Sequence, residues 1–298
     1  MKKFLALALI SIAVAVGIGL PMAAHSHSLP PMPESTSEAL SISDVNWEQL
    51  NPARGDQSPQ AGTLWGDRTG PGPSGFLLKP VDGFRSPPHI HNTAYRGVVI
   101  DGTIHNDDPD AEDMYMPVGS FWTQPAGEVH ITAAQGDDAL AYIEVEDEFG
   151  VLPAEEAFDD GDSPVNVDAS NIVWLDASNT DWIEPPSVSN QSSAPNGIND
   201  AEIAFLWGTP QDGKLNGTLV KLPAKFSGTI RSEGSALRAV VIKGQPQYRT
   251  PNKTSLQALG PGSYFSSTGK SVHQVSSDAE EESIIYVRSE GQFAIFPT

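Results

Sequence analysis

The sequence contains no cysteine among its 298 residues. This absence excludes thiol catalysis, iron–sulfur clusters, cysteine-ligated zinc and disulfide bonds. Basic residues are also few, because 17 lysines and arginines stand against 38 aspartates and glutamates, and the formal net charge is −21. A charge of this sign repels phosphate backbones, and the chain has no basic stripe that would offset it locally. We therefore expect no nucleic-acid partner.

Long amphipathic helices and the common nucleotide-binding motifs are missing as well. No segment shows a helix-length 3.6-residue periodicity, and no Walker, Rossmann or Gly-x-Ser-x-Gly spacing occurs. Instead, 27 glycines and 25 prolines help to separate short apolar or alternating runs such as 75–79, 95–100 and 139–145. This pattern predicts an all-β fold of short strands joined by many turns.

The first residues have the features of a secretory signal peptide over 1–26. Lys2 and Lys3 precede an apolar run over 4–20, and small residues follow it. We expect residues 27–44 to form a flexible leader, and the mature protein to be periplasmic or secreted with no membrane contact. The alternative is an uncleaved membrane anchor, because the apolar run approaches the length that spans a bilayer. A lipoprotein is excluded, since there is no cysteine to acylate.

Two copies of one unit follow the leader. The matched landmarks are Trp65-Gly66 with Trp207-Gly208, Gly75 with Gly217, Arg96 with Arg238, Gly102 with Gly244, His130 with His273, and Tyr142 with Tyr286. The displacement grows from 142 to 144 positions along the copy, a drift that two single-residue insertions explain. The repeat predicts two domains, over 45–165 and 166–298, and each copy has the size of a β-sandwich or jelly roll.

Three of the seven histidines form a metal-ligand pattern. His89 and His91 stand two residues apart, and alternation along a strand turns both imidazoles to one face. His130 follows a Pro125-Ala-Gly127 turn, which can bring a second strand back over the first. Three imidazoles without a competing thiol suit one divalent transition metal per chain, and iron, zinc, manganese, nickel and copper all remain open.

The spacing around these histidines resembles the two cupin motifs. The first motif is matched by Gly83, five residues, His89-Ile-His91, three residues, Tyr95, six residues and Gly102; the second by Gly119, five residues, Pro125-Ala-Gly127, two residues and His130. The Trp-Gly-Asp-Arg and Leu-Leu-Lys-Pro-Val-Asp-Gly stretches resemble the DUF4437 group of uncharacterised cupins, with similarity over about residues 45–298. The resemblance implies two tandem cupin barrels, of the double-stranded β-helix or jelly-roll type, with a metal held inside the first.

The chain departs from the cupin pattern at the usual carboxylate ligand, whose position holds Tyr95. The site is therefore expected to have three histidines, although Glu128 shares strand parity with His130, and Glu144 lies on a later strand. Either glutamate can supply the missing carboxylate, whereas acidic side chains in so acidic a chain are ordinarily solvated surface. Tyr95 shares parity with the histidines and is either a hydrogen-bond donor or substrate contact beside the metal, or a core tyrosine.

The second copy has lost most of this pattern. A constant displacement places three other residues at the positions of the two-histidine motif and the tyrosine: Arg231, Glu233 and Leu237. Only His273 persists, and a guanidinium cannot ligate a metal, so we expect the second barrel to be metal-free. The second barrel then either packs against the first, with Arg231 and Glu233 closing its cavity, or holds an anion between Arg231 and His273.

Three functions remain open at this level. The first is a metal-dependent dioxygenase that acts on a small organic substrate. The second is a metal-assisted lyase or isomerase in which Tyr95, Glu128 or Glu144 moves a proton. The third is a non-catalytic cupin that binds metal or a small ligand. The resemblance does not choose among them, because one fold hosts many reactions, and a homo-oligomer is a further open possibility.

Overall fold

The computed structural model describes residues 36–180, 201–211, 213–250, 255–278 and 280–298, so the expected signal peptide lies outside the described residues. These ranges are mostly strands, which confirms the all-β prediction. They also contain five single-turn or two-turn 3-10 helices: η1 (Ile42–Asp44), η2 (Pro52–Gln57), η3 (Ala154–Glu156), η4 (Ala169–Asn171) and η5 (Ala177–Asn179). Within the described ranges, no helix has the length and apolar character needed to cross a membrane.

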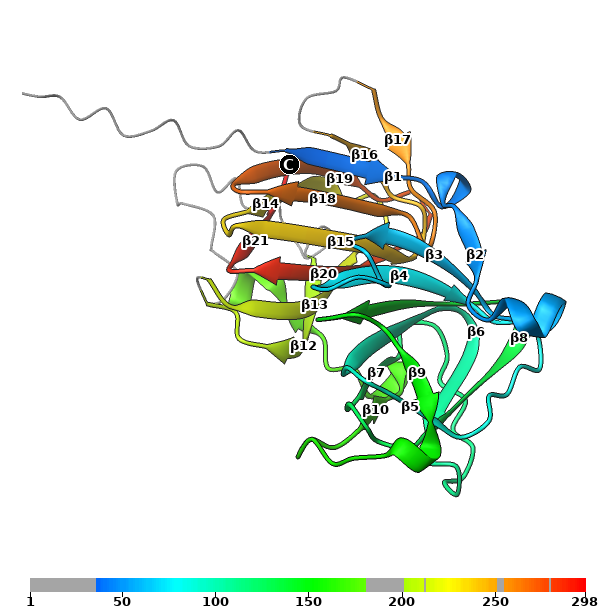
Figure 1. The fold of residues 1–298 in the computed structure, drawn as a ribbon. Helices are drawn as coiled ribbons and strands as arrows, with labels where there is room; N and C mark the ends of the chain where they lie inside the picture. Colours follow the sequence, from blue (N-terminus) through cyan, green and yellow to red (C-terminus); the bar gives the residue numbers. More distant parts are fainter. Residues whose placement is uncertain (1–35, 181–200, 212, 251–254, 279) are drawn as a thin grey trace, which may run out of the picture. The chain divides into compact units, whose positions relative to one another are not determined.

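The first unit is built on a seven-stranded antiparallel sheet (Figure 1). Its order is β10 (Val165–Val167), β7 (Phe121–Gln124), β6 (Tyr95–Asp107), β8 (Ile131–Val145), β4 (Ser74–Lys79), β3 (Gln60–Trp65) and β2 (Trp47–Gln49). A second, two-stranded sheet pairs β5 (His89–His91) with β9 (Val151–Pro153). An isolated bridge between His89 and His130 brings β5 to the start of β8.

The second unit is a sandwich of two antiparallel sheets. The larger sheet has the order β1 (Ser37–Leu40), β18 (Tyr264–Thr268), β15 (Ala236–Lys243), β20 (Ser283–Glu290), β13 (Leu215–Leu222), β12 (Glu202–Gly208) and β11 (Leu175–Asp176). The smaller one has the order β17 (Gln257–Ala258), β16 (Gln247–Arg249), β19 (Ser271–Ser276), β14 (Ser227–Ser232) and β21 (Phe293–Pro297). Both units are thus jelly rolls of the cupin type, although their sheets do not close into continuous hydrogen-bonded barrels.

Side-chain alternation along the strands divides the apolar residues among three cores. Phe76 and Ile143 belong to the core inside the first unit, and Ile230 and Phe265 belong to the core inside the second. A third core contains residues of both seven-stranded sheets: from the first unit Trp65, Leu77, Val98 and Tyr142, and from the second Leu219, Val240, Ile242 and Tyr286. The two large sheets therefore pack against each other through their outer faces.

The two-copy repeat is visible in matched contacts at this shared core. The indole N–H of Trp65 donates to the hydroxyl of Tyr142 at 3.0 Å, and Trp207 donates to Tyr286 at 2.9 Å. A Cβ at Gly75 would overlap the ring of Trp65, and the matched Gly217 lies equally close to Trp207. Glycine is required at both positions because each indole lies directly on the neighbouring strand.

Each copy begins with a strand that joins the sheet of the other unit. Strand β1 pairs with β18 of the second unit, as the neighbouring blue and orange strands in Figure 1 show, while β10 pairs with β7 of the first. The sequence predicts a flexible leader over 27–44, but residues 37–40 of this segment form a strand. They pair with residues 264–267 at the edge of the larger sheet. The predicted division after residue 165 falls inside β10, a strand of the first unit.

Candidate metal centre

The structure brings together the three histidines that the sequence predicts as ligands. Strand β5 carries His89 and His91, and His130 directly precedes β8. One ring nitrogen of each lies within 4.8 Å of those of the other two, and the ring centroids are 4.4 to 5.1 Å apart. No carboxylate belongs to this group, the one such cluster found among the described residues.

A tight turn positions His130 as the sequence predicts. Gly127 has φ = 74°, a left-handed conformation that favours glycine, and a Cβ there would overlap Phe158. The Gly127 amide donates to the carbonyl of His91 at 2.9 Å. His130 and His89 then exchange two backbone hydrogen bonds at 3.0 Å. These bonds tie the second ligand segment to the first.

The tautomer of all three imidazoles is set by backbone carbonyls. His89 Nδ1 lies 3.0 Å from the Pro87 oxygen, His91 Nδ1 lies 2.8 Å from the Gly150 oxygen, and His130 Nδ1 lies 3.0 Å from the Glu128 oxygen. A carbonyl only accepts, so each Nδ1 carries the proton and each Nε2 keeps a free lone pair. Metal-binding histidines are commonly oriented this way, and the donor set therefore fits one metal ion.

Burial keeps these imidazoles neutral. His91 and His130 are 3% and 1% exposed, and His89 is partly buried. Desolvation lowers the pKa of His89, and desolvation together with the other two imidazoles lowers the pKa of His91 well below 6.5. Desolvation, followed by the influence of His89, lowers the pKa of His130 to about 3. Neutral rings at physiological pH are the form that binds metal.

Tyr95 lies beside the cluster, on the first residue of β6. Its hydroxyl donates to Asn106 Oδ1 at 2.7 Å and lies 3.3 Å from His130 Nε2. Thr132 donates to the same Asn106 oxygen at 2.8 Å. Burial raises the pKa of Tyr95, although the hydrogen bonds to neighbouring side chains oppose this shift. Tyr95 is therefore a protonated, fixed hydroxyl at the edge of the ligand group.

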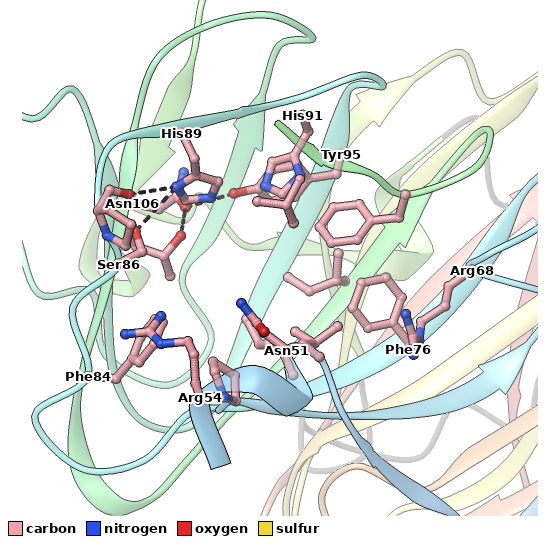
Figure 2. Close-up of a pocket in the computed structure, with 18 of the residues that line it drawn as sticks. Asn51, Arg54, Arg68, Phe76, Phe84, Ser86, His89, His91, Tyr95 and Asn106 are labelled. Carbon is pink, nitrogen blue, oxygen red and sulfur yellow. Dashed lines mark hydrogen bonds between the residues drawn. The ribbon is translucent and has the colours of Figure 1, made fainter. Parts of the chain in front are cut away.

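The cluster opens into a cavity of about 480 Å³ in the first unit (Figure 2). Its walls are largely apolar, and the residues that line it are Leu50, Asn51, Arg54, Pro59, Arg68, Phe76, Leu78, Phe84, Ser86, Pro87, His89, His91, Tyr95, Asn106, Trp122, Thr132, Ile143, Phe149 and Val151. Phe149 stacks on His91, with ring centroids 4.3 Å apart. A cavity of this size admits a small organic molecule next to the histidines.

Neither candidate glutamate joins the histidines. Glu128 acts through its backbone, since its carbonyl accepts from His130 Nδ1 and from the side-chain amide of Gln124. Glu144 lies on the opposite face of β8 from the cavity, because Ile143 and Val145 point inward and the residue between them points outward. There it accepts hydrogen bonds from Tyr142, Tyr286 and Arg288 in the interface between the two units.

Sequence reasoning missed several residues that line the cavity with the histidines. Arg54 lies on η2 and Asn51 caps its start, ahead of the first matched landmark, and Phe149, which stacks on His91, lies after the last strand of the motif. No spacing rule connects these residues to the histidine motif, so only the folded chain shows them in one cavity. The carbonyls that orient the imidazoles are equally invisible, because any residue type supplies a backbone oxygen.

The second unit differs from the sequence-based alignment by one residue. Ile230 pairs with His273 in the second unit, just as His89 bridges to His130 in the first. Ile230 and Ser232 therefore correspond to the two histidines of β5. The sequence-based alignment places Arg231 and Glu233 there instead. A one-residue shift turns a side chain to the other face of a strand. Arg231 is accordingly exposed, with its guanidinium 4.1 Å from the ring centroid of Phe296.

This shift corrects both roles expected for Arg231. It neither closes the second interior with Glu233, which pairs instead with Lys270 at 2.9 Å, nor faces His273. Both ring nitrogens of His273 are engaged, with the Tyr248 hydroxyl at 2.9 Å and Ser267 Oγ at 3.0 Å. Ile230, Leu237 and their apolar neighbours fill the space around it.

No curated protein matches the sequence of this chain, whereas several solved structures share its fold. Among solved structures, a candidate dioxygenase from Nostoc punctiforme PCC 73102 is 14% identical with a TM-score of 0.62, covering 86% of this chain and 83% of that chain. Salicylate 1,2-dioxygenase from Pseudoaminobacter salicylatoxidans is 13% identical with a TM-score of 0.51, covering 88% and 83%. A mutant oxalate decarboxylase from Bacillus subtilis is 12% identical with a TM-score of 0.50, covering 87% and 78%.

Identities this low show a shared fold alone, and the fold is that of the cupins. The family model described as a domain of unknown function, DUF4437, matches residues 38–296. That match extends over both units and includes three of the four residues of β1 and the three histidines. The chain therefore belongs to the DUF4437 family of cupin proteins, and its buried three-histidine group can hold one metal ion.

Proposed function

We propose that this protein is an exported, metal-dependent dioxygenase that acts on a small organic substrate in the cavity of the first unit. The observation that supports this proposal most directly is the arrangement of three imidazoles. Their Nδ1 protons are donated to backbone carbonyls, and their Nε2 atoms are left for a metal. Such a site, when loaded with a redox-active metal, supplies oxygen activation and polarisation of the substrate. The fold of the dioxygenases compared above supports this choice by analogy only.

The residues around the cluster would bind and orient the substrate. His89, His91 and His130 would hold the ion, and His89 and His91 line the cavity in which the substrate would meet it. The aromatic and aliphatic walls exclude water and hold an apolar body. Tyr95 presents a hydroxyl whose proton is donated to Asn106, so its remaining lone pairs can accept a hydrogen bond from a substrate group.

The composition of the cavity favours oxygen chemistry over a proton-transfer reaction. A lyase or isomerase needs a general base, and within the part of the chain that the structure describes no aspartate or glutamate lines the cavity. Glu144 lies in the interface between the units, and burial holds the pKa of Tyr95 above its ordinary value. Neither group is suited to remove a proton from a substrate near neutral pH.

Export is proposed from the N-terminal sequence alone, where two lysines precede an apolar run. The test is to express the full chain in a bacterial host, separate periplasm, medium and cytoplasm, and sequence the N-terminus of the product. A mature chain that begins near residue 27 in the periplasm or medium supports export. A full-length chain retained in the membrane or cytoplasm would contradict it.

The test of the reaction is metal analysis combined with oxygen uptake. Protein purified without chelators and reconstituted with Fe(II) should hold one iron per chain and consume oxygen only when a suitable small organic substrate is present. His91→Ala should lose both properties, whereas Arg85→Gln, an exposed substitution outside the cavity, should keep them. A site that takes up zinc and remains inert to oxygen with every substrate would favour a non-catalytic binding protein.

A further inference from the structure

The charge of the cavity is opposite to that of the chain. The sequence has 38 acidic and 17 basic residues, yet among the described residues two arginines and no aspartate or glutamate line the cavity of the first unit. The three imidazoles are neutral, so a bound divalent metal would add two positive charges without a carboxylate ligand to offset them. The cavity therefore concentrates positive potential inside a strongly acidic protein.

The two arginines differ in what they can offer a ligand. Arg68 is largely buried and donates to Glu48 at 2.9 Å, so its charge has a partner. Arg54 has no carboxylate within ion-pair distance among the described residues, and its guanidinium lies 5.3 Å from the ring centroid of Phe84. Contact with the aromatic face holds Arg54 along the wall while its N–H donors stay free.

Arg54 and the histidines lie at opposite sides of the cavity. Figure 2 shows Arg54 on the short helix η2 and Asn51 just before it, across the open space from His89 and His91. Between them the walls are apolar and partly aromatic, with Phe76, Phe84 and Phe149 among the lining residues. A ligand that reaches from one side to the other thus meets a metal, an apolar middle and a guanidinium in turn.

We infer that the ligand is a small organic acid with an apolar, ring-sized body, and that its carboxylate pairs with Arg54 on the wall opposite the histidines. This inference rests on the proposed function for the metal-facing end of the ligand and goes beyond it for the carboxylate end. Guanidinium and carboxylate form two parallel hydrogen bonds, which fix orientation as well as charge. Such a pair would point the far end of the ring toward the metal.

The experiment compares benzoate with benzyl alcohol, two probes of similar size that differ in charge. Binding is measured by calorimetry to metal-free protein and to protein loaded with redox-inert zinc. Benzoate should bind at least about tenfold more tightly than benzyl alcohol to both forms, the ratio that one charge-assisted hydrogen-bonded pair gives. Arg54→Gln should remove this preference and leave the affinity for benzyl alcohol unchanged, and Arg54→Glu should reverse the preference.

The matched control is Arg85→Gln, which removes the same charge from an arginine that does not line the cavity. It should leave both affinities at the wild-type values. Equal affinity for the two probes, or a preference that survives Arg54→Gln, would overturn the inference. A preference confined to the zinc-loaded form would assign the carboxylate to the metal and also overturn it. These outcomes do not depend on oxygen uptake, so the inference and the proposed reaction can fail separately.

Discussion

The two units share one fold but differ in what fills their interiors. The first interior is a cavity lined by His89, His91 and Tyr95, whereas the second places Ile230, Ser232 and Leu237 at the corresponding positions. Only the third histidine is present in both. The comparison teaches that different side chains at a few positions on two strands separate a ligand site from a packed core, while the surrounding sheets keep the same pairing.

The units also differ at the place where they meet. Glu144 and Arg288 occupy matched positions of the repeat, and they contact each other at 3.2 Å with side chains 1% and 2% exposed. Tyr142 and Tyr286, also matched, contact each other with ring centroids 5.5 Å apart. Contacts between matched residues indicate a local two-fold relation between the units. In a symmetric dimer of identical subunits, the same residue would occupy both matched positions, and two like charges would meet. A duplicated chain can place a glutamate at one position and an arginine at the other, and so form an ion pair.

The largest expected effect tests the difference between the interiors. His130→Gln removes a ligand and should abolish metal content, while His273→Gln, the same change in the second unit, should leave one equivalent per chain. Elemental analysis of both variants, with circular dichroism to verify folding, measures this. Two equivalents in the wild type, or loss of metal in His273→Gln, would restore the second unit as a metal site.

The next effect tests the interface between the units. Arg288→Met leaves Glu144 as a buried carboxylate whose nearest remaining cation is Arg96 at 3.7 Å, so unfolding free energy should fall by about 3 to 5 kcal/mol. The exposed pair of Lys243 and Glu282 serves as the control, and Lys243→Met should cost less than about 1 kcal/mol. Urea unfolding measures both. Equal losses would show that the interface does not depend on the buried pair.

A chelator should destabilise the wild type through the first unit alone. At a free metal concentration of 100 times Kd, bound metal contributes about 2.7 kcal/mol, which a chelator removes. His91→Ala, which lacks the site, should show almost no shift in melting temperature on chelation. The same shift in His91→Ala and the wild type would place the metal elsewhere.

The pH dependence of the metal-free protein should involve both units. The pKa of His130 is lowered to about 3 and that of His273 to about 4, below the ordinary value of 6.5. Between pH 6.5 and these values the unfolded chain binds more protons than the folded one, so stability falls as pH drops. His273→Gln should make this decline shallower without changing the effect of a chelator at neutral pH. An unchanged decline would mean that His273 does not contribute.

The smallest effect concerns Tyr95, which the second unit replaces with leucine. Tyr95→Phe keeps the ring and loses one hydrogen bond to Asn106, which still accepts from Thr132. Stability should fall by about 0.5 to 1.5 kcal/mol and metal content should stay at one equivalent. Loss of metal in this variant would make Tyr95 part of the ligand set.

The sequence predicts the strand-rich fold, the repeat and the three converging histidines because each can be recognised from residue spacing, either within a motif or between the two copies. Alternation fixes the faces of His89 and His91, and the Gly127 turn returns His130 to them. Spacing fails where a single residue is inserted or removed: the constant displacement chose Arg231 and Glu233, although strand pairing aligns Ile230 and Ser232 with the ligands. A one-residue error cannot be seen without the partner strand.

Other features depend on contacts between distant parts of the chain. The sequence shows that Glu144 points to the opposite face of its strand from Ile143 and Val145. It does not show which face of β8 lines the cavity, because the second unit packs against the other face only in the folded chain. The leader prediction failed over 37–40 because a short polar segment becomes a strand only when a sheet edge is open to it. No local sequence pattern in that segment indicates that it pairs with the edge strand β18.

The exchange of β1 and β10 between the units sets the order in which these strands become able to pair as the chain emerges from its N-terminal end. The first unit can complete its sheet as soon as β10 has been made, before the second copy exists. Strand β1 must wait, since Thr36 and Thr268, whose hydroxyls lie 2.8 Å apart, are separated by 232 residues. Loop closure over such a separation is slow, and an unpaired strand is exposed to wrong partners in the interval. The earliest strand of the described chain is thus among the last to find its place.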